Sequence, residues 1–173
     1  MPVHSIMLPD SKILKRVAGL KSVVIVGCKL CANDSLAFHT DYPIGRFAVD
    51  KDIGETVFLP IPIEEEEKRL KNLLESKGMS VRTETLGCPV CEISYQTEPD
   101  ILELAKRCVG ADAILSLSCV VGTLALKKQL GKALKIVPAM KTVGVLQPCK
   151  VLDEAKEFLY LDKNHSTLIR FKV

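Results

Sequence analysis

Cysteines are the residues of this chain whose type and spacing are best suited to chemistry. Four of the seven form two Cys-x-x-Cys pairs, Cys28/Cys31 and Cys88/Cys91, and Cys119 follows as a fifth. One such pair lets two thiolates bind a metal from a single turn, and two pairs complete a four-sulfur set suited to zinc or to an iron–sulfur cluster. Because Cys119 adds a sulfur that a closed zinc site does not need, we expect a cluster, with zinc as the alternative.

The first pair also allows a redox interpretation. If Cys28 and Cys31 open a helix after a strand, as in thioredoxin-like proteins, the helix dipole lowers a thiol pKa and permits thiol–disulfide exchange. This second alternative leaves the other pair without a role, so we rank it last. Cys108 falls on the apolar face of a predicted helix and is expected in the core. Cys149, after Pro148, is a weaker candidate ligand.

Continuous apolar runs predict the strands that must position these cysteines. Strands are expected at 23–26, 79–86, 113–117 and 136–145, with amphipathic helices at 12–20, 63–77, 97–109 and 122–135. The acidic run at 64–67 is expected to be a solvated first turn. Strands that alternate with helices imply right-handed crossovers. We therefore predict one α/β domain over residues 1–173, a three-layer doubly wound (flavodoxin/Rossmann-like) fold with a mostly parallel four- to five-stranded sheet.

The predicted fold brings the cysteines of distant loops to one place. Each cysteine of the two pairs, and Cys119, follows the end of a predicted strand. In an open parallel sheet the carboxyl ends of the strands share one edge, and ligands bind there. The predicted metal ligands are therefore Cys28, Cys31, Cys88, Cys91 and Cys119.

Two segments do not follow the alternation of strand and helix. Residues 46–50 and 56–59 have the pattern of a hairpin inserted at about 45–60. The tail is expected to form a short helix near 153–158 and an edge strand at 167–173. Either segment is a candidate surface for a partner protein.

Charge and composition exclude several classes of protein. The 24 basic and 21 acidic residues are spread along the chain without a basic block, which argues against a nucleic-acid partner. The chain has neither a signal-peptide pattern nor a run of about 18 apolar residues, so we expect a cytoplasmic protein without a membrane partner. His4, His39 and His165 have no evident nucleophile nearby, and Gly-rich phosphate loops are absent, so no catalytic residue is predicted.

Three motifs, in this order, resemble those of a known family. They are Val23-Val-Ile-Val-Gly-Cys-Lys-Leu-Cys-Ala32, Ala111-Asp-Ala-Ile-Leu-Ser-Leu-Ser-Cys119 and Pro138-Ala-Met-Lys-Thr142. Over roughly residues 10 to 147, the chain resembles the cysteine-rich small subunit of acetogen-type methylenetetrahydrofolate reductase. The resemblance implies a protein with a 4Fe–4S cluster that works beside a flavin-bearing or other redox partner in one-carbon metabolism. Such a subunit supplies structure or electrons and is not itself the catalyst.

The resemblance also assigns ligands, with one departure. Cys28, Cys31 and Cys119 match family cysteines, and either Cys88 or Cys91 matches the cysteine after the second strand. Four residues after the second cysteine the family has a further cysteine, where this chain has Ser35, and Cys91 is a candidate replacement. The cysteine-dense carboxyl-terminal segment is also absent, which argues against a second metal centre and against the family's usual docking to the reductase.

Overall fold

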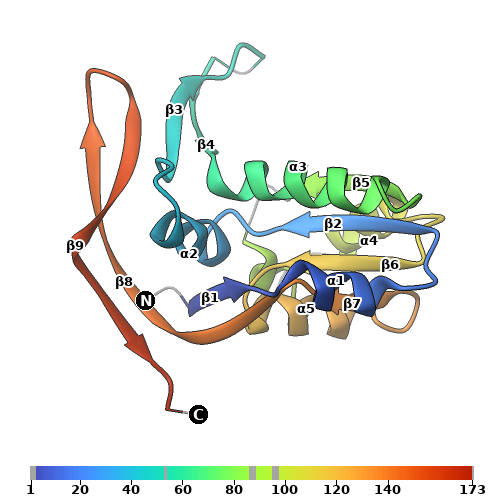
Figure 1. Ribbon diagram of the computed structural model, residues 1–173. Coiled ribbons are helices and arrows are strands. Elements are labelled where there is room, and N and C mark those ends of the chain that lie inside the picture. The colour runs from blue at the N-terminus through green and yellow to red at the C-terminus, as the bar shows by residue number, and fades with distance from the viewer. Residues whose placement is uncertain (1–2, 53, 86–88, 95–97, 173) are drawn as a thin grey trace.

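The computed structural model describes residues 3–52, 54–85, 89–94 and 98–172. In this part of the chain it shows an α/β protein with five α-helices, a four-stranded parallel sheet and a five-stranded antiparallel sheet (Figure 1). None of the helices described is long and apolar enough to cross a lipid bilayer.

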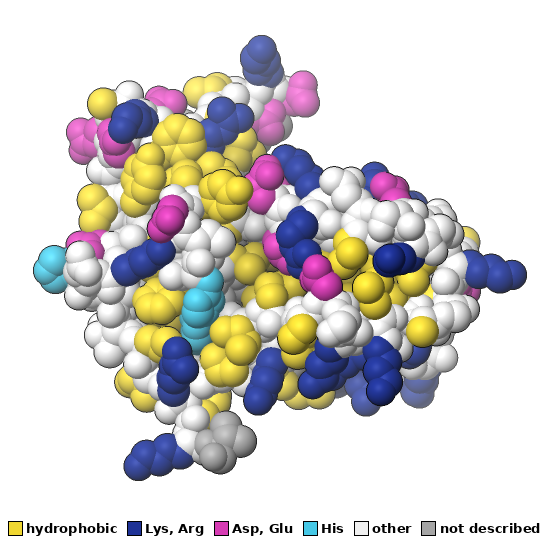
Figure 2. All heavy atoms as spheres, viewed as in Figure 1, with side chains coloured by type: hydrophobic (Ala, Val, Ile, Leu, Met, Phe, Trp, Pro, Cys, Tyr) yellow, Lys and Arg dark blue, Asp and Glu magenta, His cyan; other side chains and the backbone are white. Residues whose placement is uncertain are grey.

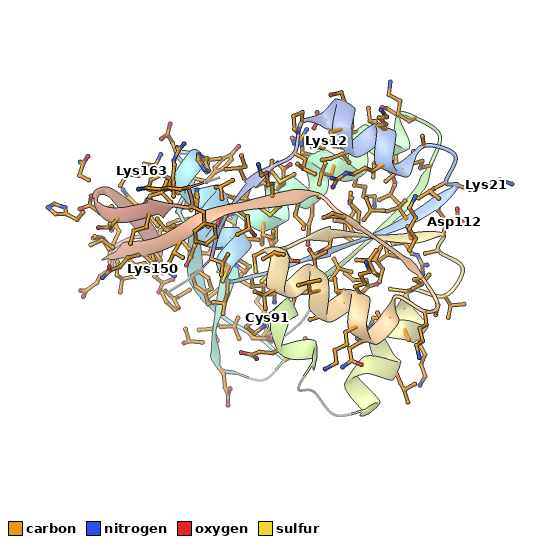
Figure 3. The ribbon with its side chains drawn as sticks, turned by 90° about the horizontal axis from the view of Figure 1, so that it is seen from below. Lys12, Lys21, Cys91, Asp112, Lys150 and Lys163 are labelled. Carbon is orange, nitrogen blue, oxygen red and sulfur yellow. The ribbon has the colours of Figure 1, made fainter. Side chains whose placement is uncertain are left out.

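The parallel sheet confirms the predicted strands at 23–26, 79–86 and 113–117, and the start of the strand predicted at 136–145. It contains β2 (Ser22–Gly27), β5 (Ser80–Thr85), β6 (Ala113–Leu117) and β7 (Lys135–Pro138), in the order β5-β2-β6-β7. Helices α1 (Asp10–Val17) and α3 (Pro62–Glu75) lie on one face, and α4 (Glu98–Arg107) and α5 (Val120–Leu130) lie on the other (Figure 3). The Asp112 carboxylate ties β2 to β6 at the end of the sheet away from Cys91, because it accepts the backbone N–H of Lys21 at 2.6 Å.

The main core forms between this sheet and its helices. Val24 and Ile25 of the inner strand β2 have no exposed surface, and neither do Leu70 of α3 and Leu126 of α5. A strand covered on both faces needs apolar residues in succession, which explains the continuous β-branched run in the sequence. Because the inner strands are held from both sides, the loops that follow them start from fixed positions.

The antiparallel sheet was not predicted. It contains β1 (Val3–Met7), β8 (Met140–Asp153), β9 (Phe158–Arg170), β3 (Gly45–Val49) and β4 (Thr56–Pro60), in the order β1-β8-β9-β3-β4. The predicted hairpin at 45–60 is confirmed, because β3 and β4 pair from Gly45 with Pro60 to Val49 with Thr56. The predicted strand at 136–145 is divided at Ala139 between the two sheets. The backbone N–H of Ala139 donates to the carbonyl of Ser116 in β6, and its carbonyl accepts the N–H of Leu8 after β1.

The prediction for the tail was wrong in two respects. Residues 154–157 form a turn instead of a helix, and β9 begins at Phe158 instead of 167. Strand β9 pairs with β8 along most of its length, so its backbone N–H and carbonyl groups have hydrogen-bond partners. A short helix without such neighbours is only marginally stable. Glu157 ends the turn with a φ of 57°, which closes the long hairpin.

A further helix lies where the two sheets meet. Helix α2 (Cys31–His39) begins just beyond the carboxyl end of β2 and packs against β1 and α3 (Figure 1). Its side chains Asn33, Asp34 and Ser35 are buried, which is unusual for polar residues and reflects its position between neighbours on several sides. Asn33 satisfies both ends of its amide there: it donates to the carbonyl of Ile44 at 2.8 Å and accepts the N–H of Ile63 at 3.1 Å.

Candidate metal centre

Four cysteines from three separate loops meet at the carboxyl edge of the parallel sheet. Cys28 follows β2, Cys31 opens α2, Cys119 precedes α5, and Cys91 lies in the short 3-10 helix η1 (Val90–Ser94) after β5. The side chains of Cys31 and Cys119 are hydrogen-bonded, and Cys28 acts electrostatically on both Cys31 and Cys91. Four of the five predicted ligands therefore lie in one region of the molecule, and two of them, Cys31 and Cys119, are in contact. The fifth, Cys88, lies outside the described residues.

The end of β2 places Cys28 next to the neighbouring strand. The backbone N–H of Cys28 donates to the carbonyl of Leu117 at 3.1 Å, and the residue is only 2% exposed. Gly27, just before it, has no side chain because the carboxylate of Glu67 from α3 occupies that space. Glu67 is only 4% exposed, so the prediction that the acidic run is solvated was wrong for this residue.

Strand β1 holds the second cysteine from the other side. The backbone N–H of Val3 reaches the sulfur of Cys31. Ser35 lies one turn further along α2, where its hydroxyl donates to the carbonyl of Cys31 at 2.5 Å and accepts the N–H of Ser5 at 3.1 Å. At the position where the resembled family has a cysteine, this chain thus has a buried serine that joins β1 to α2.

Small side chains around Cys119 allow η1 to approach α5. A methyl group added at Gly122 would lie 3.2 Å from Val90 Cγ1 and 2.8 Å from Ser118 Oγ, so glycine permits the close packing that brings Cys91 to the site. Beneath the cysteine, Ser118 and Ser116 are hydrogen-bonded through their hydroxyls at 2.7 Å. This contact stiffens the turn between β6 and α5.

The sulfurs differ in their readiness to ionise. The hydrogen bond from Cys31 lowers the pKa of Cys119, and the backbone N–H groups of Gly122 and Val121, which favour its thiolate, lower it further. The same hydrogen bond, together with burial, raises the pKa of Cys31. Burial, followed by the charges of Cys28 and Cys119, raises the pKa of Cys91. Within the hydrogen-bonded pair, Cys119 is therefore the more acidic thiol.

This donor set fits a cationic centre, because a bound metal deprotonates the thiols that ligate it. Among the residues described, however, no group of three or more His, Cys, Asp or Glu side chains lies in an arrangement that could hold a metal ion. A closed zinc site needs sulfurs at about 2.3 Å from one ion, and hence within about 4 Å of one another. The described thiols do not meet that requirement.

The two other cysteines lie elsewhere. Cys108 is 1% exposed within the apolar core, as predicted. Cys149 lies in β8 of the antiparallel sheet, where it pairs with Asp162 and its backbone N–H donates to Ser166 Oγ at 2.9 Å. The weaker candidate ligand thus belongs to a sheet that the sequence did not predict.

Two polar contacts around α2 were missed by sequence reasoning. His4 of β1 and His39 of α2 lie with their Nε2 atoms 3.0 Å apart, and Asp34 forms an ion pair of 2.9 Å with Lys150 of β8. Partners so far apart in the chain leave no local sequence pattern. The sequence showed only that His39 follows an apolar stretch. Both contacts fasten α2, and with it Cys31, to the antiparallel sheet.

Comparison with known proteins adds no relative. No family model matches this chain, and no curated protein or solved structure matches it.

Proposed function

We propose that this protein is a single-cluster iron–sulfur protein in which Cys28, Cys31, Cys91 and Cys119 hold a 4Fe–4S cluster. The observation that carries the proposal is the meeting of these four cysteines from three loops at one sheet edge. Cysteine thiolates are the usual ligands of such clusters. Cys88 remains the alternative ligand to Cys91.

The proposed fold is doubly wound and flavodoxin-like, which supports a ligand at this edge. If the parallel strands are numbered along the chain, the observed order β5-β2-β6-β7 reads 2-1-3-4. Helices on both faces give three layers. In such folds ligands bind where the strand order reverses. That point lies here between β2 and β6, the strands that Cys28 and Cys119 follow.

The proposed role is that of an accessory subunit in the cytoplasm, similar to the small subunit of methylenetetrahydrofolate reductase, that passes electrons to a flavin-bearing or other redox partner or organises it. When bound, the cluster would supply one-electron transfer. Cys28, Cys31, Cys91 and Cys119 would hold the cluster in place. Leu30, Val120 and Val121 are each 49% exposed next to Cys31 and Cys119, which is suitable for contact with a protein partner.

The test is the metal content of protein purified without oxygen. About four irons and four sulfides per chain, with a broad visible absorption band, are expected, as for other 4Fe–4S proteins. Serine variants of Cys28, Cys31, Cys91 and Cys119 are each expected to lower iron and sulfide, whereas Cys149→Ser, a matched control in the other sheet, should keep both. Protein that holds neither iron nor sulfide after anaerobic reconstitution would contradict the proposal.

Two other functions are tested by the same preparation. One zinc per chain without sulfide would indicate a zinc-stabilised protein-binding module without redox activity. A thiol–disulfide oxidoreductase is the second alternative. The contact that favours it joins Cys31 to Cys119, whereas the pair expected from the sequence was Cys28 and Cys31. That function requires a disulfide that can be titrated in metal-free protein and activity that is lost in Cys31→Ser.

A further inference from the structure

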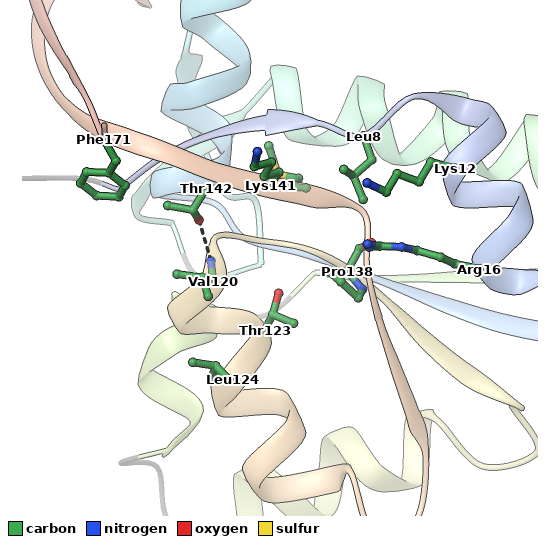
Figure 4. Close-up of a pocket in the computed structure, with 11 residues that line it drawn as sticks. Leu8, Lys12, Arg16, Val120, Thr123, Leu124, Pro138, Lys141, Thr142 and Phe171 are labelled. Atoms are coloured by element: carbon green, nitrogen blue, oxygen red, sulfur yellow. Dashed lines mark hydrogen bonds between the residues drawn. The ribbon is translucent and has the colours of Figure 1, made fainter. Parts of the chain in front are cut away.

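A pocket separate from the cysteines lies between α1, β8 and the start of α5 (Figure 4). Its volume is about 590 Å³, which is within the range of sites for small organic ligands. Most of its wall is apolar and consists of Leu8, Val120, Leu124, Pro138, Met140 and Phe171. Such a wall suits an apolar group.

Three cations border this apolar wall. Lys12 and Arg16 extend from successive turns of α1, and Lys141 extends from β8 (Figure 4). Arg16 donates to the carbonyl of Pro138 at 2.9 Å, whereas neither Lys12 nor Lys141 has an ion-pair partner among the described residues. The lining described for the pocket contains no acidic side chain. Figure 2 shows basic side chains gathered along the lower right edge of the molecule, where α1 and α5 lie in Figure 1.

The positive charge around this pocket comes from side chains and not from the start of α5. The N–H of Val120, at the start of α5, already donates to the hydroxyl of Thr142 at 2.9 Å. Three like charges around a partly apolar hollow raise the local potential, which a bound anion would lower. The charge and the apolar wall together therefore favour a ligand that has both properties.

We propose that this pocket binds a small amphipathic anion, with its apolar body against Leu124 and Phe171 and its phosphate or carboxylate between Lys12, Arg16 and Lys141. The ligand would lie beside the candidate metal centre, because Val120 of the pocket directly follows Cys119. No cysteine lines the pocket in the described residues, so the binding can be tested independently of the cluster.

Two probes that differ in charge provide the test. 1-Anilinonaphthalene-8-sulfonate has an apolar ring body and an anionic group, and N-phenyl-1-naphthylamine has the same body without the charge. Calorimetric titration of the full chain should show one site that binds the sulfonate at least about tenfold more tightly, as expected for a charge-assisted contact. Equal affinity for the two probes would overturn the proposal.

Variants locate the site. Lys12→Ala and Lys141→Ala should each weaken sulfonate binding about threefold or more and reduce its salt dependence. Lys15→Ala removes the same charge from the same helix outside the pocket lining and should change little. The proposal fails if Lys15→Ala acts as strongly as Lys12→Ala. Circular dichroism spectra verify that each variant is folded.

Competition identifies the anion. Displacement of the sulfonate probe by 1-naphthyl phosphate would indicate a phosphate-bearing ligand, and displacement by 1-naphthoate would indicate a carboxylate. If neither compound displaces the probe, the pocket does not bind this class of ligand. Iron and sulfide content should be the same in Lys12→Ala as in the unmodified protein, so a failure here leaves the cluster proposal intact.

Discussion

Mild acid should destabilise this protein through the buried histidine His4. The residue is 1% exposed, its ring lies against the rings of Phe38 and His39, and the charge of Arg170 acts on it from β9. Burial first, and then the charges of His39 and Arg170, lower the pKa of His4 to about 4. The folded protein therefore keeps this ring neutral at a pH where the unfolded chain binds a proton.

The sign and the size of the effect follow from the two pKa values. Between pH 6.5 and about 4 the unfolded state binds more protons, so the free energy of unfolding falls as the pH falls. The slope is at most about 1.4 kcal/mol per pH unit. The stability is fully present above pH 6.5 and is lost toward pH 4. From pH 7 to 4.5 the loss due to His4 alone is about 2 kcal/mol.

Urea unfolding, followed by circular dichroism at several pH values from 7 to 4.5, measures this loss. His4→Phe keeps an aromatic ring at the position but cannot bind a proton, so its free energy of unfolding should fall by about 2 kcal/mol less over this range. His165→Gln is a comparison variant that removes a histidine whose side chain is 76% exposed. If His4→Phe shows the same pH dependence as the unmodified protein, the reasoning from burial is wrong.

Two further substitutions test contacts around the candidate metal centre. Lys150→Met leaves the 4% exposed Asp34 side chain without its ion-pair partner and should cost about 1–3 kcal/mol at pH 7. The cost should shrink near pH 4, since burial raises the pKa of Asp34, and an equal cost at both pH values would contradict this explanation. Gly27→Ala places a methyl group against the Glu67 carboxylate and should cost about 1–3 kcal/mol, measured by urea unfolding. That cost should shrink when Glu67→Ala is the background, and a cost that is the same in both backgrounds would refute the steric argument.

The parallel sheet could be predicted because its signal is local. Strands buried on both faces need uninterrupted apolar runs, and the runs at 23–26 and 113–117 correspond to β2 and β6. The positions of cysteines just after these strands follow from the same reasoning, because parallel strands end at one edge. The order and direction of the strands were therefore enough to predict that Cys28, Cys31 and Cys119 lie near one another.

The antiparallel sheet could not be predicted in this way. Strand β1 is near the amino terminus and pairs with β8, more than 130 residues later, and β9 joins β8 to the hairpin of β3 and β4. Exposed strands with mixed polarity carry a weak pattern, so their partners are decided by packing over long distances in the chain. The helical pattern at 153–158 was local, and pairing of the flanking strands outweighed it.

The sequence by itself therefore determined which cysteines follow which strands, since this depends on runs of four to six residues along the chain. The tertiary structure decided which side chains touch: Cys31 with Cys119, His4 with His39, and the cations of α1 with Lys141 around one pocket. These contacts join segments that are 35 to more than 100 residues apart in the chain. They depend on the distance between elements after folding, which no spacing in the sequence specifies.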